Sequence, residues 1–364
     1  MTASLITRLK PLADWRARLS SSGAKQPAKH SALAVDFGDD ALRVLQLTAS
    51  GALHGATCVE TPALEPLAKL EWQLANLAAL IRSGGFKGKR AVCSVPSWMT
   101  TVQRLQVAKS EGVDAQQAID GAIIAQTGFE PGELVYKIFD ASRTDNAEVL
   151  MLAAERRFVD RLLKGLCDAK LEPVGMQSEF TALVHGFEPV FADEAQAART
   201  SMCIDIDAND TKLVIMRGAE LLFARSIEIG ANKLTPGSSD QQPSHDSAPL
   251  SDNLLHMTGE LNPAAPWNTE SVEILTDEIL MSMRYHAGSG QGRRIDRVLF
   301  TGRGACAREM CIAITRRLRL PAFIADPFAA ASRKGCEVAL GVDPSIAHPD
   351  WAVAFGLAVS PTDL

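Results

Sequence analysis

The stretch VDFGDDALRVLQL at residues 35–47 has a counterpart later in the chain, IDIDANDTKLVIM at residues 204–216. In each copy an apolar run ends in an aspartate (Asp36 or Asp205), a polar turn follows, and a cation stands seven residues after the aspartate. The two cations are Arg43 and Lys212. A second apolar run and a glycine complete both copies, which predicts two β-hairpins. Because the copies lie too far apart in the chain for a solenoid repeat, we expect two lobes of one topology facing each other across a cleft.

The composition, with 364 residues, 46% hydrophobic and 22% charged, is that of a folded protein of two to three domains. The net charge of −6 argues against a general nucleic-acid binder. The cysteines and histidines show no metal-ligand spacing, and no hydrolase elbow or Walker A loop occurs. No apolar run is long enough to span a bilayer. We therefore expect a cytoplasmic protein that acts mainly by binding.

Four regions are predicted along the chain. The first is a basic, flexible tail, for which a membrane-surface anchor is the alternative. A lobe with the order βββαβ comes next, followed by an inserted α+β subdomain and then a second lobe. The second lobe contains a disordered loop at 236–253 and ends in an apolar helix that returns to the first lobe. The boundaries are 1–30 for the tail, 31–100 for the first lobe, 101–171 for the insert and 172–364 for the second lobe.

Three features together could form a nucleotide site. The turns after Asp36 and Asp205 offer backbone N–H groups to phosphate oxygens, and their carboxylates could hold hydrated Mg²⁺. The Gly302-Arg303-Gly304 turn, between a strand and a helix, would let a nucleoside approach the backbone closely. Ordinary turn chemistry is the alternative for each feature taken alone.

The order of these features resembles the actin-like ATPase superfamily and, within it, the PilM family of type IV pilus assembly proteins, related to FtsA. ALAVDFGDDALRVLQL (32–47) is similar to the family's first phosphate loop, and CSVPSWMTTVQRLQV (93–107) to the start of its inserted subdomain. LTDEILMSMRYHAG (275–288) and IDRVLFTGRGA (295–305) resemble its adenosine-side helix and loop. The resemblance implies an α/β actin-like ATPase fold, with two RNase H-like lobes of βββαβ units and an inserted α+β subdomain in the first.

The resemblance also implies site residues for ATP and Mg²⁺. Asp36 and Asp205 would organise the metal and the attacking water, and Glu179 would orient that water if hydrolysis occurs. Two alternatives remain open: Glu179 as a helix-cap partner, and Arg43 as an exposed strand cation. The residues implied to bind nucleotide are Asp36, Gly38, Asp39, Arg43, Asp205, Asp207, Thr211, Glu278, Gly302, Arg303 and Gly304.

Departures from the family pattern weaken this site. The position usually held by serine in the first loop is Asp39, and the expected glycine of the second loop is Asp207. Arg303 also replaces a glycine in the third loop. Two unit charges roughly 4 Å apart repel by about 4 kcal/mol at an effective dielectric constant near 20. We therefore expect a degenerate nucleotide site on a scaffold, with an active ATP-driven switch as the alternative.

The resemblance implies a membrane-anchored partner as well. A PilN-like protein would dock its cytoplasmic peptide on the inserted subdomain, with Trp98 and Arg104 as candidate contacts. A core position is the alternative for Trp98. Other pilus platform proteins and self-association are further expected contacts, and the expected location is the inner face of the inner membrane. A filament-forming, FtsA-like protein is a third interpretation, but Pro11 argues against a long membrane-targeting helix.

Overall fold

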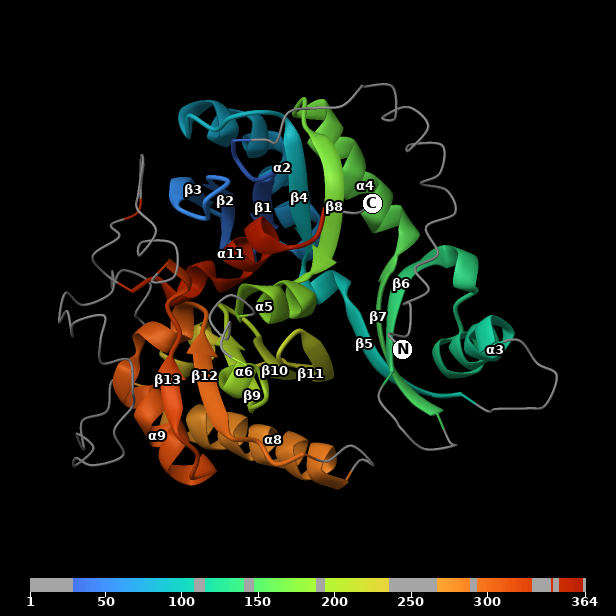
Figure 1. Cartoon of the computed structure of the whole chain (residues 1–364), viewed down its shortest axis with the longest axis vertical. Helices are drawn as coiled ribbons and strands as arrows, with labels where there is room; N and C mark the ends of the chain where they lie inside the picture. Colours follow the sequence, from blue (N-terminus) through green and yellow to red (C-terminus); the bar gives the residue numbers. More distant parts are fainter. Residues whose placement is uncertain are drawn as a thin grey trace.

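The computed structural model describes residues 29–107, 115–140, 147–187, 194–235, 267–288, 293–328, 342 and 347–362. The predicted tail, up to residue 28, and the predicted loop at 236–253 lie outside these residues. The described residues form three sheets, two of five strands and one of three (Figure 1). No helix in this part of the chain combines the length and the apolar character needed to cross a bilayer.

The first sheet has the order β3-β2-β1-β4-β8. An antiparallel meander opens it, and β4 and β8 then add parallel to β1. Every residue of β1 is buried, which explains its continuous apolar run and makes Asp36 an exception within it. The elements are β1 (Leu33–Phe37), β2 (Ala41–Leu47), β3 (Leu53–Glu60), α2 (Pro66–Ser83), β4 (Arg90–Val95) and β8 (Glu172–Ser178).

The second sheet repeats this topology in the order β11-β10-β9-β12-β13. Here too a three-stranded antiparallel meander is followed by parallel strands. The prediction of two lobes with the same topology is confirmed. The strands are β9 (Thr200–Ile206), β10 (Thr211–Arg217), β11 (Glu220–Ile227), β12 (Arg297–Thr301) and β13 (Ala322–Ile324).

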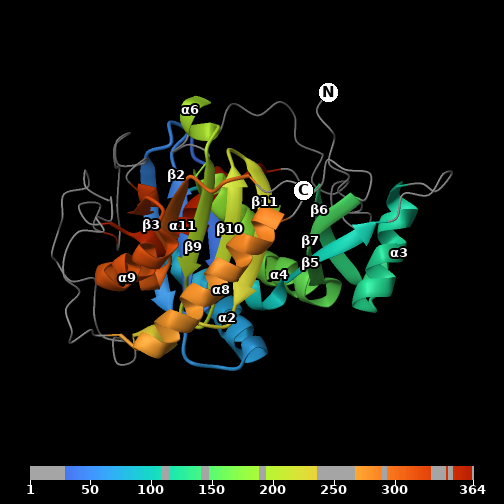
Figure 2. The same cartoon turned by 90° about the horizontal axis from the view of Figure 1, so that it is seen from below.

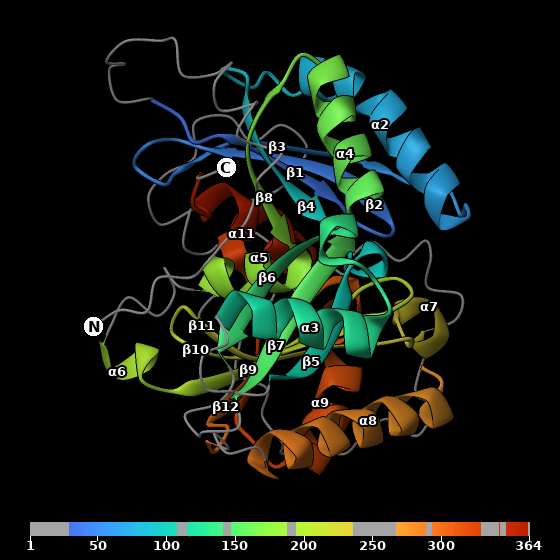
Figure 3. The same cartoon turned by 90° about the vertical axis from the view of Figure 1, so that its right-hand side faces the viewer.

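The inserted subdomain is smaller than the sequence boundaries suggest. Its antiparallel sheet, β5-β7-β6, carries α3 on one face, where Leu105, Ile123 and Met151 form a core (Figure 3). The helix that follows, α4 (Arg156–Asp168), instead packs Leu162 and Leu166 into the core of the first lobe. The elements of the insert are β5 (Thr101–Val107), α3 (Ala115–Thr127), β6 (Leu134–Asp140) and β7 (Ala147–Glu155).

The boundary predicted at residue 171 separates β8 from the sheet to which it belongs. It pairs with β4 in the first sheet, whereas the boundary assigned residues 172–178 to the second lobe. The physical reason is the parallel connection. A chain that leaves β4 needs a long crossover before it can return parallel to it, and here the whole insert and α4 provide that crossover.

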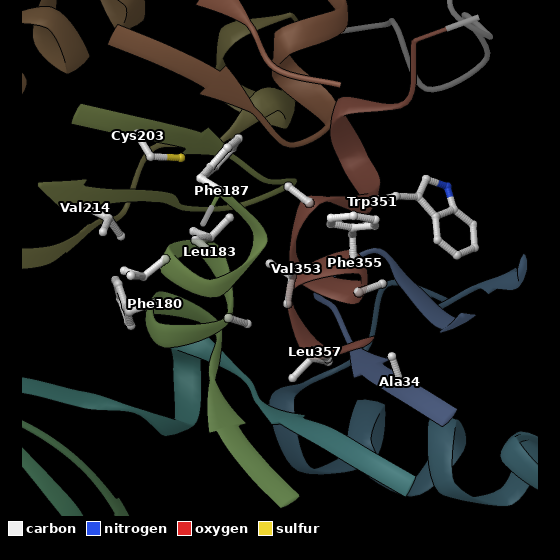
Figure 4. Packing of buried hydrophobic residues seen from close by; sticks show 14 of the residues in the cluster. Ala34, Phe180, Leu183, Phe187, Cys203, Val214, Trp351, Val353, Phe355 and Leu357 are labelled. Carbon is white, nitrogen blue, oxygen red and sulfur yellow. The ribbon is translucent and has the colours of Figure 1, made fainter. Parts of the chain in front are cut away.

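Two helices lie between the five-stranded sheets. These are α5 (Glu179–Phe187) and α11 (Ala352–Val359), and their apolar side chains fill the space between the lobes (Figure 4). The close approach requires glycine: a Cβ on Gly356 would lie 1.9 Å from the carbonyl oxygen of Ala182. Since α11 also contacts β1, β2 and β4, the end of the chain returns to the first lobe.

The outer faces of the two large sheets carry the remaining long helices. Helices α2 and α4 cover the first sheet, and α8 (Thr269–Gly288) and α9 (Arg308–Leu318) cover the second (Figure 3). Short elements complete the description: η2 (Ser97–Met99), η3 (Pro131–Glu133), α6 (Glu194–Ala197), α7 (Ala231–Leu234), η5 (Arg303–Cys306) and η6 (Pro349–Trp351).

Candidate functional site

The two hairpins place an aspartate opposite a cation in the same register. Asp36 of β1 pairs with Arg43 of β2, and Asp205 of β9 pairs with Lys212 of β10. All four side chains are buried, and Lys212 is 0% exposed. The spacing of seven residues in the sequence therefore corresponds to a cross-strand pair at the end of each hairpin.

The ammonium group of Lys212 is surrounded by carboxylates. Its Nζ lies 2.9 Å from Oε2 of Glu179, 3.1 Å from Oδ2 of Asp205 and 3.1 Å from Oδ2 of Asp207. An oxygen of Asp210 lies 4.0 Å away. Glu179 is the first residue of α5, so the contact joins the interlobe helix to the second lobe. Of the three predicted catalytic residues, Asp205 and Glu179 are brought together around the same lysine.

Burial and pairing shift the ionisation of this cluster. Burial alone lowers the pKa of Lys212, but Glu179, Asp207 and Asp205 together hold it well above its usual value. Burial raises the pKa of Glu179 and of Asp205 despite the nearby lysine. Burial would also raise the pKa of Asp207, but Lys212 and Arg43 lower it below its ordinary value. At neutral pH the cluster therefore holds a charged ammonium and an ionised Asp207.

Arg43 plays the corresponding part in the first lobe. Its Nη2 lies 3.0 Å from Oδ1 of Asp40 and 3.7 Å from Oδ2 of Asp350. Arg303 approaches the same Asp40, at 3.8 Å. Burial raises the pKa of Asp36 to about 7, although Arg43 opposes the shift. The Oδ1 atom of Asp36 has no hydrogen-bond partner within the described residues.

Asp39 links the two hairpin turns directly. One of its carboxylate oxygens accepts a hydrogen bond from the amide of Asn209, in the β9–β10 turn of the other lobe. The other oxygen pairs with Lys69 of α2. The residue that stands at the family's serine position therefore spans the space between the two turns.

Polar groups of the β9–β10 turn form hydrogen bonds within the second lobe. The Asp207 carboxylate accepts a hydrogen bond of 2.9 Å from the N–H of Ala208, and the Asp207 N–H donates to the carbonyl of Asp210 at 2.9 Å. The hydroxyl of Thr211 donates to the carbonyl of Ile229 at 2.6 Å. These turn groups are therefore already paired within the protein.

The glycine turn after β12 packs closely on β9. A Cβ on Gly302 would lie 2.4 Å from the carbonyl oxygen of Ile206, and one on Gly304 would lie 2.4 Å from its Cγ2. Gly302 also has a φ of +78°, which favours glycine. Close strand contact therefore accounts for both glycines.

A Mg²⁺ ion does not fit among the carboxylates that surround Lys212. The position between Glu179, Asp205 and Asp207 holds the Lys212 ammonium, so a second cation there would be repelled. The repulsion among carboxylates that the sequence suggested is also offset, because Lys212, Arg43 and Lys69 lie among them. The chain's own cations therefore offset part of the carboxylate charge at this site.

Three predicted residues lie in other surroundings. Glu278 pairs with Arg225 of β11, at 2.5 Å. Trp98 is partly buried and packs against the core of the first lobe, and its Nε1 has no hydrogen-bond partner among the described residues. Arg104 lies between two aromatic rings of the second lobe, 5.2 Å from the centroid of Phe223 and 4.8 Å from that of Tyr285.

Arg104 also lines a groove of about 670 Å³ between the insert and the second lobe. Residues of β5 and β7 form one wall, and residues of β11 and α8 form the other. The guanidinium of Arg104 pairs with Glu148 at 3.2 Å, which holds it at this joint.

The sequence assigned no site role to several residues that complete the hairpin cluster. Lys212 carried a usable signal, because it stands seven residues after Asp205 as Arg43 does after Asp36. Lys69 and Asp350 had none, since only the packing of α2 and η6 brings them to the turns. Asn209 and Asp40 were visible only as turn formers.

Comparisons with known proteins agree with this architecture. The family model described as type IV pilus assembly protein PilM matches residues 134–361, more than half of the chain. A solved PilM–PilN type IV pilus biogenesis complex matches 91% of this chain and 99% of its own chain, at 18% identity and a TM-score of 0.67. No curated protein matches the sequence.

Two further solved structures are less similar. The ethanolamine utilization protein EutJ from Carboxydothermus hydrogenoformans is 12% identical over 96% of both chains, with a TM-score of 0.49. MreB 5 of Spiroplasma citri, solved bound to AMPPNP, is 11% identical over 85% of this chain and 95% of its own, with a TM-score of 0.45.

The repeated five-stranded sheets, the three-stranded insert and the family match lead to the same assignment. This chain, with its actin-like ATPase fold, belongs to the PilM family of type IV pilus assembly proteins.

Proposed function

We propose that this protein is a scaffold of a type IV pilus or related secretion machine and binds its partners without requiring nucleotide. The observation that carries the proposal is the set of contacts around Lys212, whose ammonium lies within 3.1 Å of three buried carboxylates. A site that already contains its counter-ion gains little from Mg²⁺. The degenerate ATP site is therefore part of the proposal.

The contacts between the lobes support the same function. In a nucleotide-driven switch, the ligand would bridge the two hairpin turns, and its loss would separate them. Here Asp39 and Asn209 bridge the turns directly, and α5 and α11 fill the interlobe core. The lobes are thus held together by the chain's own residues, as a constant binding surface requires.

The proposed partner is the cytoplasmic peptide of a PilN-like inner-membrane protein. The solved relative is, by its description, a PilM–PilN complex, and this chain covers 99% of the one chain that it matches there. We propose that the peptide docks on the inserted subdomain and that Trp98 and Arg104 contribute to the contact. Such a partner would hold the protein at the inner face of the inner membrane.

Calorimetric titration tests both parts of the proposal. The protein is titrated with ATP and Mg²⁺ and, separately, with a synthetic cytoplasmic peptide of a PilN-like protein. The Asp39→Ser/Asp207→Gly double variant is the matched comparison, because it restores the residues usual in the family. We expect the peptide to bind equally well with and without ATP, and the double variant to bind ATP better than the unmodified protein.

Results of the titration that differ from these expectations would change the proposal in specific ways. Tight binding of ATP by the unmodified protein, with a change in its affinity for the peptide, would replace this proposal with the ATP-driven switch. A folded double variant that binds no better than the parent would mean that these two aspartates do not determine nucleotide binding. Absence of peptide binding would exclude the PilN-like partner.

A further inference from the structure

The groove between the insert and the second lobe lies apart from the hairpin site and takes no part in it. Its floor and walls contain apolar side chains from three strands and one helix. The apolar contributors include Val102 of β5, Leu150 of β7, Phe223 of β11 and Met281 of α8. A volume of about 670 Å³ is in the range of pockets that bind small ligands and is large enough for a few side chains of a peptide.

The charged side chains that line the groove are basic, although the protein as a whole is acidic. The chain has a net charge of −6, but the described residues that line the groove include three arginines and no carboxylate. Arg104 and Arg225 have acidic partners nearby, Glu148 and Glu278. Arg284 is exposed and has no ion pair within the described part of the chain. It is therefore available to an acidic ligand.

An exposed apolar stripe continues from the groove along α8. Ile274, Met281 and Tyr285 are 48%, 49% and 53% exposed. Their spacing of seven and four residues places them on one helix face. Figure 2 shows α8 crossing the second lobe toward the insert. Large apolar side chains that share one exposed face are typical of an interaction surface.

Contacts within the protein hold the groove wall around Arg104 in place. Its guanidinium is held between the rings of Phe223 and Tyr285, and the Tyr285 hydroxyl donates a hydrogen bond of 3.1 Å to Glu148. These contacts join the insert to the second lobe. A preformed groove binds a segment with less loss of conformational entropy than a groove that must first be ordered.

We propose that this groove binds a short acidic segment of another assembly protein, with an apolar side chain against the exposed Met281 and Tyr285 and a carboxylate on Arg284. The proposal rests on the proposed function, since it treats the chain as a scaffold, and it adds the chemistry of one partner. Because the walls belong to two parts of the protein, the bound segment also holds the insert against the second lobe.

The test uses two short fluorescein-labelled peptides and fluorescence anisotropy with the full chain. In one peptide, leucines at helical spacing alternate with glutamates; in the other, lysines replace the glutamates. We expect the Glu–Leu peptide to bind and the Lys–Leu peptide to bind at least tenfold more weakly. Hydrogen exchange with the Glu–Leu peptide present should show protection at residues 102–104 and 281–285.

Variants with matched controls locate the contact. Arg284→Glu should weaken binding of the Glu–Leu peptide by about tenfold, whereas Arg82→Glu, the same charge change on the exposed side of α2, should not. Met281→Ser should weaken it several-fold, whereas Leu67→Ser should not, although Leu67 is similarly exposed at 47%. All four positions are exposed, so these variants should fold.

Equal binding of the two peptides would overturn the proposal. So would an Arg284→Glu variant that behaves like Arg82→Glu, or protection confined to another surface. None of these measurements uses nucleotide or a PilN-like peptide. If the groove does not bind the Glu–Leu peptide, the calorimetric titration still tests the proposed function. If the calorimetric titration contradicts the proposed function, the peptide measurements still test this groove.

Discussion

Lys212 stands opposite Asp205 across the β9–β10 ladder, with its Nζ 3.1 Å from the aspartate Oδ2. Arg43 occupies the same register opposite Asp36 in the other lobe. In both hairpins the residue that would face a bound phosphate or metal has a fixed cation beside it. The register of the two hairpins thus places one cation beside each of these aspartates, where substitutions can test its effect.

Lys212→Met should lower the free energy of unfolding by about 3–5 kcal/mol, because it leaves Glu179, Asp205 and Asp207 buried without their shared cation. Urea unfolding at neutral pH measures the change. Lys233→Met is the control, since Lys233 is exposed. The control should stay within about 0.5 kcal/mol of the parent. A loss at Lys212 no larger than that at Lys233 would contradict the prediction.

Asp36→Asn should flatten the dependence of stability on pH. The pKa of Asp36 is raised from 3.8 to about 7 in the folded protein, so the folded state binds its proton more tightly than the unfolded state. Its stabilising contribution is complete below the lower pKa and is lost as the pH rises through the higher one. The slope that the variant removes is at most about 1.4 kcal/mol per pH unit. Chemical denaturation across this pH range measures it.

Asp207→Asn provides an internal comparison of opposite sign. Lys212 and Arg43 lower the pKa of Asp207, despite its burial, so its contribution is present at neutral pH and is lost as the pH falls. The Asp207 variant should therefore differ most from the parent at neutral pH and least in acid. Identical pH profiles for the Asp36 and Asp207 variants would show that the two carboxylates are not in different environments.

Gly302→Ala should destabilise the second lobe by about 2 kcal/mol or more. The change combines a strained φ of +78° with a Cβ only 2.4 Å from the Ile206 carbonyl oxygen. Gly121→Ala, in α3, meets nothing within 4 Å, and it should raise stability by up to about 1 kcal/mol. Thermal unfolding of the two variants compares them directly. If the Gly302 and Gly121 variants changed stability in the same direction, the result would contradict the close packing of the glycine turn on β9.

Gly356→Ala should separate α11 from α5, because its Cβ would lie 1.9 Å from the Ala182 carbonyl oxygen. Overpacking of this kind costs about 1–3 kcal/mol. Limited proteolysis should cleave the variant faster than the parent in the interlobe region, and urea unfolding gives the size of the loss. Gly288→Ala is the control, since nothing lies within 4 Å of its Cβ position. An unchanged Gly356 variant would argue against the interlobe packing in Figure 4.

Local sequence patterns were sufficient for most of the fold. The predicted order βββαβ is the order of β1, β2, β3, α2 and β4, because alternating turns and apolar runs determine short antiparallel hairpins locally. The strand β8 was placed on the wrong side of a domain boundary, since its pairing with β4 spans the whole insert and leaves no mark in the local pattern. Strands that are neighbours along the chain were therefore predicted correctly, whereas the long-range parallel pair of β4 and β8 was not.

The two hairpins, with their aspartates and the cation seven residues beyond each, could be predicted from the amino-acid sequence, because strand register is a local property. From these residues alone the centre of the protein looked like a cluster of repelling carboxylates. The contacts that offset this repulsion come from packing between distant segments of the chain. This packing brings Glu179 from α5 to Lys212, and Lys69 from α2 and Asn209 from the other lobe to Asp39. Electrostatic energy depends on distances in space, and packing between distant segments sets those distances.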